Sequence, residues 1–287
     1  MSNSYIGIFR EAEHSPERIV DDELILKAVA EKLSSLNQTQ VRVIFPAELH
    51  TIDKTPDVIF NMAEEEPVLE KLSEFERQGV RVVNSVQGVR NTFRQEMTAM
   101  LDGLPFVPET ILCSTSATPP GHPSGVWVKR GDYHAIEKED VVFAQTAQDL
   151  EKILRSFEAR GIEAVVIQRH VPGDLIKFYG VREPDHGVNG NTRWFHWFYH
   201  KDQDLKNYPF DRQELQSRCE QAADRLSLEI FGGDAIVTEQ GDIFIIDVNA
   251  WPSFALFRDT AAEHIAHHIM EKVTPVSSAY TTDQNQH

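Results

Sequence analysis

The stretch from residue 232 to residue 249 restricts the fold of this 287-residue chain more than any other. Two runs rich in β-branched and apolar residues, 235–238 and 243–247, lie on either side of Glu-Gln-Gly-Asp at 239–242. Strand-forming runs separated by a short polar segment with a glycine indicate a β-hairpin. We therefore expect two paired antiparallel strands here.

The expected pairing brings acidic and amide side chains together on one face of the hairpin. If Thr238 pairs with Ile243, counting outward along both strands places Asp234 opposite Asp247. Since side chains on one face of a strand recur at every second residue, Asn249 shares the face of Asp247. Two carboxylates directly opposite each other destabilise a sheet unless a cation lies between them.

Carboxylate and amide oxygens are ligands that suit magnesium, and magnesium bound in this way commonly serves the phosphates of a nucleotide. The sequence therefore predicts that Asp234, Asp247 and Asn249 bind Mg²⁺. An exposed hairpin with scattered acids is the alternative interpretation. The flanking strands are too apolar for a solvent-exposed hairpin, which favours the metal site.

The same segment resembles the metal-binding end of the ATP-grasp superfamily, in which an Asp and a hairpin are followed by Glu-x-Asn-x-x-Pro. Here Gly-Gly-Asp at 232–234 precedes the hairpin, and Asp-Val-Asn-Ala-Trp-Pro-Ser at 247–253 ends it. Asp247 stands where most members have Glu, so its side chain is shorter but carries the same charge. The resemblance covers most of the chain. It implies a mixed α/β and α+β protein, with a mostly parallel N-terminal α/β domain followed by a two-subdomain ATP-grasp fold.

Strands and helices alternate in the first third of the chain, which predicts a mostly parallel sheet with ligands beyond the carboxyl ends of its strands. Ser15 is the expected N-cap of the first helix, and one helix is expected from the Ser85 cap to about Leu101. The expected strands cover 5–9, 41–45, 57–61 and 80–83, and a further helix covers 64–77.

The resemblance implies that the rest of the chain divides into two subdomains, and periodicity places the expected strands and helices within them. We expect the N-terminal domain over 1–103, the small ATP-grasp subdomain over 104–173, the large subdomain with the metal hairpin over 174–276, and a polar tail over 277–287. Beside the hairpin, the expected strands cover 125–129, 141–144, 164–168, 175–181 and 194–199, and the expected helices cover 147–160, 212–226 and 259–273.

Charge and composition oppose several classes of partner. The net charge is −17 and the pI is near 5.1, which opposes broad binding to nucleic acid or to anionic membranes. No apolar run approaches the roughly 20 residues of a membrane span, and no secretory signal pattern is visible. The two cysteines define no disulfide framework. We expect a cytoplasmic protein that acts on small molecules, and a homodimer stays open.

An apolar strand at 126–129 ends in Lys129. A lysine that extends its amine from a strand edge into water is one interpretation. The resemblance instead implies that Lys129 binds the α- and β-phosphates of ATP. The next segment has one glycine where the family has a glycine-rich lid, so Arg130 and His134 are expected to take over part of the phosphate contact.

Residues 164–174 resemble the hinge at which ATP-grasp proteins hold adenine. By matching position, Gln168, His170 and Val171 line the base, and Asp174 accepts hydrogen bonds from the ribose hydroxyls. A buried strand packs against a flat base, and groups at its end contact the edge of the base. A strand followed by a Pro-Gly turn fits the same residues.

Cations beyond magnesium are expected at the transferred phosphoryl group, where negative charge develops. The resemblance implies that Lys177, on the strand 175–181, reaches this group, with Arg193 and Arg258 as further candidates. Family members commonly have a Lys that touches ATP from the N-terminal side. Arg94 is nearest to that position, although Arg and Lys differ in geometry.

Three histidines, His264, His267 and His268, have helical spacing that could bind a transition metal. A polar helix surface is the favoured interpretation of that pattern.

The resemblance implies an Mg-dependent, ATP-dependent ligase that activates a carboxylate as an acyl phosphate for attack by an amine. The alternatives are an ATP-grasp kinase that phosphorylates a hydroxyl, such as those acting on inositol phosphates, and a nucleotide-binding regulatory module. Glu64 follows an N-terminal strand, and we expect it to bind a positively charged substrate group. Acids at a helix start are also favoured by the helix dipole, so helix capping is the other interpretation of Glu64.

Overall fold

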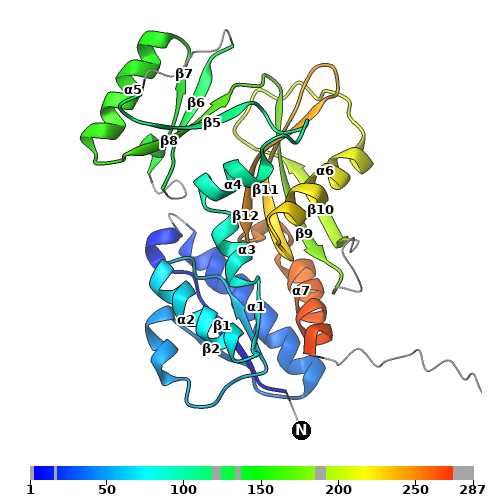
Figure 1. Ribbon diagram of the computed structural model, residues 1–287. Helices are drawn as coiled ribbons and strands as arrows, with labels where there is room; N and C mark the ends of the chain where they lie inside the picture. Colours follow the sequence, from blue (N-terminus) through cyan, green and yellow to red (C-terminus); the bar gives the residue numbers. More distant parts are fainter. Residues whose placement is uncertain (1–2, 16–17, 118–123, 133–136, 185–191, 274–287) are drawn as a thin grey trace, which may run out of the picture.

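A computed structural model describes residues 3–15, 18–117, 124–132, 137–184 and 192–273. In this part of the chain the strands form three four-stranded sheets. Figure 1 shows how these sheets follow one another along the molecule. The parallel sheet lies at the N-terminal end of the molecule, and the other two sheets are antiparallel. The expected mixture of a parallel α/β layer with antiparallel α+β layers is therefore confirmed.

The N-terminal sheet has the strand order β2-β1-β3-β4, and all of its pairs are parallel, as expected. Parallel pairs need crossover connections, and helices supply them. The elements are β1 (Tyr5–Ile8), α1 (Ile19–Asn37), β2 (Arg42–Ile44), β3 (Val58–Asn61), α2 (Glu66–Arg77), β4 (Arg81–Val83), α3 (Val86–Asn91) and α4 (Arg94–Leu101), with short 3₁₀ turns at Ala12–His14 and Pro46–Thr51.

Two helix expectations in this region were wrong. Helix α1 has Arg18 as its N-cap residue, whereas the hydroxyl of Ser15 donates a 2.6 Å hydrogen bond to Asp22. The single helix expected up to Leu101 is divided into α3 and α4. Ser85 does cap α3, but the Thr92 hydroxyl donates to the Val89 carbonyl and so competes with the helical backbone bonds.

The small subdomain contains a sheet of order β5-β8-β6-β7, in which every pair is antiparallel. Helix α5 packs against one face through Leu150, Leu154 and Phe157, which share an apolar cluster with Val128 and Ile167. The elements are β5 (Thr110–Ser114), which the sequence analysis did not identify, β6 (Val126–Arg130), β7 (Val141–Ala144), α5 (Ala147–Ala159) and β8 (Ala164–Arg169), with a 3₁₀ turn at Lys138–Asp140.

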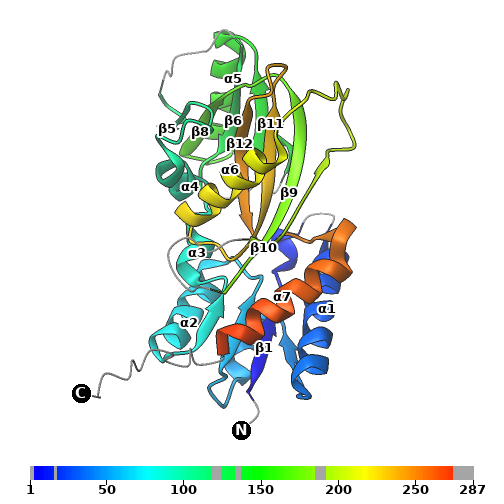
Figure 2. The same cartoon turned by 90° about the vertical axis from the view of Figure 1, so that its right-hand side faces the viewer.

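The large antiparallel sheet has the order β10-β9-β11-β12. Helix α6 covers one of its faces, and α7 returns to the N-terminal sheet and packs beside α1 (Figure 2). The elements are β9 (Asp174–Arg182), β10 (Thr192–Tyr199), α6 (Arg212–Arg225), β11 (Ile230–Val237), β12 (Ile243–Ala250), a 3₁₀ turn at Ala255–Phe257 and α7 (Arg258–Val273).

Apolar side chains join the N-terminal sheet and the large sheet into one body. One cluster combines Leu69 and Leu72 of α2 with Phe178 of β9. A second cluster combines Ile25 of α1 with Ile265 of α7. The domain limits expected from the sequence stay predictions, but these contacts mean that the first and last helices share one core.

His268 lies in that shared region and corrects the expectation of a polar histidine surface on α7. Its side chain is buried, with Nδ1 2.7 Å from the Arg182 carbonyl and Nε2 2.5 Å from Glu229. A carbonyl only accepts, so Nδ1 donates, and the ring anchors α7 to the end of β9 and to Glu229, just before β11.

Among the described helices, none combines the length and the apolarity that a membrane span requires.

Candidate functional site

The hairpin of β11 and β12 pairs Asp234 with Asp247, as expected. The residues next to the turn are paired differently, since Val237 rather than Thr238 lies opposite Ile243. A β-bulge between Asp234 and Ala235 in the pairing register compensates for this shift. The extra residue is Ile246 of β12, so a bulge lies directly beside the expected metal ligand, a common place for one near a functional site.

The three expected metal ligands lie on the face of the large sheet opposite α6. Asn249 donates its amide NH₂ to Asp247 Oδ2 at 3.2 Å, so its amide oxygen is not used in that bond. Within the described ranges, no three His, Cys, Asp or Glu side chains gather into a metal-binding group. The set is therefore two carboxylates and an amide, which fits Mg²⁺ because Mg²⁺ takes one or two carboxylates and completes its shell with phosphates and water.

Lys177 supplies a cation to this group. It pairs with Asp234 in the β9–β11 register, and its Nζ lies 2.7 Å from Asp234 Oδ1. Its neighbours Ile176 and Phe178 are buried on the α6 side, so alternation turns Lys177 to the metal face. Only glycine fits at position 233, because a Cβ there would lie 2.1 Å from the Asp247 carbonyl oxygen.

Lys129 lies across from the trio, at the end of β6. Its Nζ donates to Gln168 Oε1 at 2.9 Å and to the carbonyl of the bulged Ile246 at 3.1 Å. The pKa of Lys129 is lowered to about 8, chiefly by burial and also by the Arg94 charge, while the charges of Asp247 and Asp234 act in the opposite direction. The interpretation of Lys129 as a solvent-exposed edge lysine is wrong, because its side chain is buried.

Arg94 begins α4 and is only 4 % exposed. In the part of the chain that the structure describes, its Nε has no hydrogen-bond partner. Burying a charged group costs free energy unless an opposite charge or hydrogen bonds compensate for it. Arg94 and Lys129 are thus two buried cations close enough to repel each other, which indicates a place for an anion.

The expected adenine residues lie at the end of β8 and just after it. Gln168 is buried and donates to the Thr110 hydroxyl at 3.2 Å, and Val171 is also buried. His170 accepts a hydrogen bond from the Trp127 indole at 3.1 Å, and burial lowers the pKa of His170. The imidazole is therefore held neutral against an aromatic side chain, and its contact with adenine stays a prediction.

Two other expected nucleotide contacts have protein partners instead. Arg130 lies on the α5 face of its sheet, away from Lys129, where it pairs with Asp132 at 2.8 Å and with Asp140 at 3.4 Å. Asp174 accepts hydrogen bonds from the backbone amides of Lys206 and Tyr208, at 2.8 and 2.9 Å. Their ATP roles stay untested predictions. His134 lies outside the described residues.

The two further arginines expected at the phosphoryl group also lie elsewhere. Arg193 pairs with Glu271 of α7 at 2.6 Å, and Arg258 pairs with Asp21 of α1 at 2.7 Å. Both pairs join surface-facing elements around α7. The structure therefore brings Lys177, but neither arginine, to the three expected metal ligands, which are called the metal trio below.

Two pockets flank the trio. A pocket of about 300 Å³ lies between the N-terminal domain and the large sheet, and Lys177, Asp234 and Asn249 line it. A second pocket, of about 440 Å³, lies between α4, the end of β8 and the middle of β12, where Gln168 and Asp247 line it. The three expected metal ligands thus lie between a space beside the N-terminal domain and a space beside the expected hinge.

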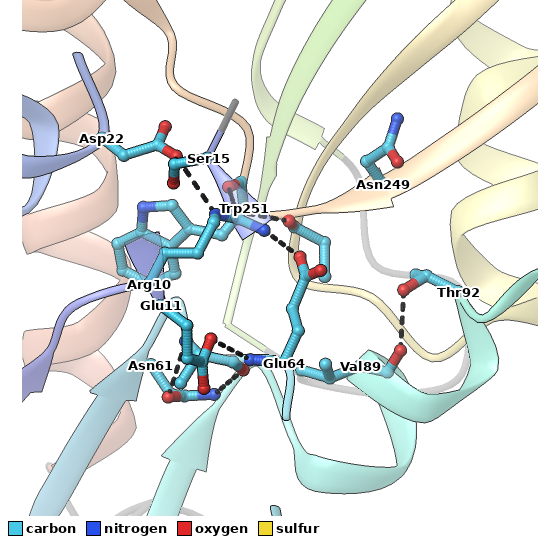
Figure 3. Close-up of polar contacts among 12 residues, drawn as sticks. Arg10, Glu11, Ser15, Asp22, Asn61, Glu64, Val89, Thr92, Asn249 and Trp251 are labelled. Carbon is cyan, nitrogen blue, oxygen red and sulfur yellow. Dashed lines mark hydrogen bonds and ion pairs between the residues drawn. The ribbon is translucent and has the colours of Figure 1, made fainter. Parts of the chain in front are cut away.

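Several polar residues of the first pocket had no role in the sequence analysis. Figure 3 shows the Arg10 side chain between Asp22 and Glu64, where it also reaches the backbone at Trp251. Tyr179 faces the same pocket, and burial raises its pKa to about 12, so its hydroxyl is protonated at neutral pH. The position of Arg10, just past the carboxyl end of β1, was a usable signal, because ligands gather at that edge.

Solved structures of similar shape were found across nearly the whole chain. The ATP-grasp ligase PsnB, solved with a minimal precursor, has a TM-score of 0.63 at 15 % identity and covers 95 % of this chain and 100 % of its own. The D-alanine–D-alanine ligase of Bacillus anthracis, solved with ATP, has a TM-score of 0.63 at 13 % identity, with 95 % and 99 % covered. The D-alanyl-alanine synthetase A of Vibrio cholerae has a TM-score of 0.67 at 12 % identity, with 95 % and 99 % covered.

No protein-family model matches the chain, and no curated protein does either. The TM-scores show a shared fold, and at identities this low the similarity shows the fold alone.

Proposed function

We propose that this chain, which has the ATP-grasp fold, is an ATP-dependent ligase that joins a carboxylate to an amine. The observation that carries the proposal is the pair of buried cations, Lys129 and Arg94, beside the Asp234–Asp247 pair. Cations without sufficient counter-charge next to paired carboxylates suit a phosphate chain that arrives with a divalent metal. Two neighbours of the same fold are ligases by name and a third is a synthetase, which supports this class of reaction.

The phosphates would lie between the two groups of charged residues. Lys129 would exchange its hydrogen bonds to the neutral carbonyl oxygens of Gln168 and Ile246 for bonds to phosphate oxygens, which are stronger because the acceptor is also charged. Asp234, Asp247 and Asn249 would hold Mg²⁺, which when bound neutralises charge on the phosphates. We assign the adenine to the hinge at Gln168, His170 and Val171, and this assignment rests on the resemblance to other ATP-grasp hinges.

The carboxylate to be activated fits the pocket lined by Lys177, Tyr179 and Asp234. Attack by a carboxylate oxygen on the γ-phosphorus forms an acyl phosphate and releases ADP. An amine then attacks the acyl carbon, loses a proton, and displaces inorganic phosphate. No protein nucleophile is required, because positioning and electrostatic stabilisation supply most of the rate.

Lys177 is the residue of this chain best located to act on the γ-phosphoryl group. Its ammonium already lies 2.7 Å from Asp234 and opens to the pocket. We therefore assign it to charge that develops on the phosphoryl oxygens, which positioned cations stabilise. Arg193 and Arg258 already pair with Glu271 and Asp21, which makes them weaker candidates for that work.

The test is an incubation of the protein with MgATP and pools of acids and amines, with ADP, phosphate and products measured together. ADP and free phosphate in equal amounts, with an amide product, are the expected result. ADP with a phosphorylated product and no free phosphate would indicate the kinase. Nucleotide binding without turnover on any pool would indicate the regulatory module and contradict a ligase.

A further inference from the structure

We infer that Arg10 is a positioning residue that fixes the end of the metal-binding strand β12 from the N-terminal domain. This inference rests on the proposed function, because it concerns the site that would hold Mg²⁺ and ATP. Arg10 lies just past β1, whereas Asn249 lies at the other end of the chain, in the last strand of the large sheet. The geometry joins these two regions through one guanidinium group.

Each end of the Arg10 guanidinium has a defined partner. Its Nε lies 3.2 Å from Asp22, and one terminal nitrogen bonds to Glu64. The other terminal nitrogen donates to the Trp251 carbonyl at 2.7 Å and approaches the Ala250 carbonyl at 3.5 Å. The side chain is only 10 % exposed, so water does not substitute freely for these partners. Arg10 therefore bridges two acids of the N-terminal domain and two carbonyls that follow Asn249.

The N-terminal side of this bridge is itself held in place (Figure 3). The Glu11 carboxylate accepts the backbone amides of Glu64 and Glu65, at 3.0 and 3.2 Å. Asn61 exchanges two hydrogen bonds with the backbone of Ala63, at 2.9 and 3.0 Å. These contacts fix the loop that carries the Glu64 side chain before any ligand binds. The acid that orients Arg10 is thus already oriented.

The other side of the bridge is a strained stretch of backbone. Trp251 has φ 42° and Phe254 has φ 51°, a left-handed conformation that side chains of this size rarely adopt. Such residues persist only where surrounding contacts enforce them, and they concentrate at functional sites. Trp251 is fully buried, and Arg10 supplies the donor for its carbonyl. Loss of Arg10 would leave that carbonyl without this donor and free the turn that begins two residues after Asn249.

This arrangement also gives Glu64 a different role from the one expected from the sequence. Its carboxylate is bound to Arg10 and is only 6 % exposed, so a cationic substrate would have to compete with a buried guanidinium. Partners of metal ligands commonly matter nearly as much as the ligands do. We therefore assign Arg10, oriented by Glu64 and Asp22, to the geometry of Asn249.

The experiment measures Mn²⁺ affinity in the presence of a non-hydrolysable ATP analogue, from the paramagnetic resonance signal of free Mn²⁺. Arg10→Met should weaken Mn²⁺ binding by at least about tenfold, the usual size of the effect when the partner of a metal ligand is lost. The Mg²⁺ concentration for half-maximal ADP formation should rise by a similar factor. Arg90→Met is the matched control, because Arg90 pairs with Glu66 at the start of α2, two residues after Glu64.

A second pair of variants separates positioning from simple charge balance. The triple variant Arg10→Met, Asp22→Asn and Glu64→Gln leaves no unpaired acid in the bridge, yet it still lacks the donor for the two carbonyls. It should lose as much Mn²⁺ affinity as Arg10→Met alone. Asp22→Asn with Glu64→Gln keeps Arg10 and its carbonyl bonds, so its Mn²⁺ affinity should stay within about threefold of the original, an effect below 1 kcal/mol.

The outcomes are distinguishable. If the triple variant regains the original Mn²⁺ affinity, or if the double variant loses it as fully as Arg10→Met, the acids act by charge and the inference is overturned. If Arg10→Met does not fold, Arg10→Lys replaces it, because one ammonium cannot reach both acids and both carbonyls. If the unmodified protein binds no Mn²⁺ in the presence of the analogue, that result contradicts the proposed function itself, and with it the role of Arg10.

Discussion

The small subdomain and the rest of the molecule are held together in different ways. The parallel sheet and the large sheet share two apolar clusters, one through α2 and one through α1 and α7. The apolar cluster of the small sheet contains only residues of that subdomain. In Figure 1 the small sheet and α5 lie at the end of the molecule opposite the N-terminal sheet.

Polar contacts follow the same division. The Asn84 side chain, fully buried, bonds to the backbone of Glu229 and Ile230 at the start of β11. Arg10 bonds to the backbone at the end of β12. The N-terminal domain therefore holds the first residues of β11 and the last residues of β12 in the hairpin. The small subdomain reaches that hairpin through the Lys129 bond to Ile246, through the Arg169 guanidinium over the Phe244 ring, and through the Phe106 carbonyl, which accepts the Ile245 amide.

The difference teaches how the two halves of the proposed nucleotide site are built. The proposed metal ligands belong to a body with continuous cores, whose geometry is set on folding. Lys129 belongs to a sheet with a separate apolar cluster, which meets the hairpin through polar and cation–π contacts, and such contacts exchange more readily than buried apolar ones. We expect the small subdomain to close on ATP as a hinged unit.

The largest expected effect is on the rate of the reaction, at the proposed metal ligands of the large sheet. Asp247→Asn removes one ligand charge from the trio and should lower the rate of ADP formation by at least about 100-fold, in line with the loss of a main electrostatic contact. Circular dichroism should report an unchanged fold. Asp242→Asn, in the turn of the same hairpin, is the control and should retain activity. Retained turnover in Asp247→Asn would contradict the metal assignment.

The next effect tests the separation of the cores. Phe157→Ala in α5 and Ile265→Ala in α7 should each lower the free energy of unfolding, by about 3–5 and 2–5 kcal/mol respectively, because both side chains are buried. Hydrogen exchange should show faster exchange only in the small subdomain for Phe157→Ala. For Ile265→Ala the rate of hydrogen exchange should rise in α1 and in the parallel sheet. Faster exchange throughout the molecule in Phe157→Ala would break the comparison.

A smaller effect concerns the cation of the small subdomain. Lys129→Met removes a charge-assisted bond to phosphate and should weaken MgATP binding by about 10- to 100-fold, measured by calorimetry. Lys152→Met, at an exposed position of α5, should bind MgATP normally. The thermal stability of the ATP-free protein should not fall in Lys129→Met, because a buried charge has been replaced by an apolar group of similar length. Unchanged MgATP affinity would place the nucleotide elsewhere.

The smallest effect is a pH dependence. Burial lowers the pKa of Lys129 to about 8, so its ammonium loses its proton as the pH rises through that value. Phosphate binding needs the charged form, and linkage predicts that MgATP affinity falls by about tenfold between pH 7 and pH 9. Lys129→Met has no proton to lose there and should show a flat profile. A fall of equal size in that variant would assign the titration to another group.

Much of the fold and part of the site could be predicted because they depend on short-range pattern. The apolar pattern at 175–181 predicted the strand that carries Lys177, and the turn at 239–242 predicted the hairpin. The opposition of Asp234 and Asp247 was predicted with an incorrect register near the turn. The bulge at Ile246 corrected the count, and no local feature of the sequence indicated that bulge.

The sequence by itself determined most of the strands and helices in their order, with β5 missed and α3 and α4 merged, and it determined the hairpin with its acidic face. These features follow from periods of two and 3.6 residues, which operate over a few neighbours. Only the tertiary structure decided that Arg10 meets Trp251, 241 positions away, and that Glu64 binds Arg10. It also decided that Arg130, Arg193 and Arg258 bind acids outside the metal trio. A charged side chain finds its partner when packing brings distant segments together, and the sequence gives no separation at which to look for it.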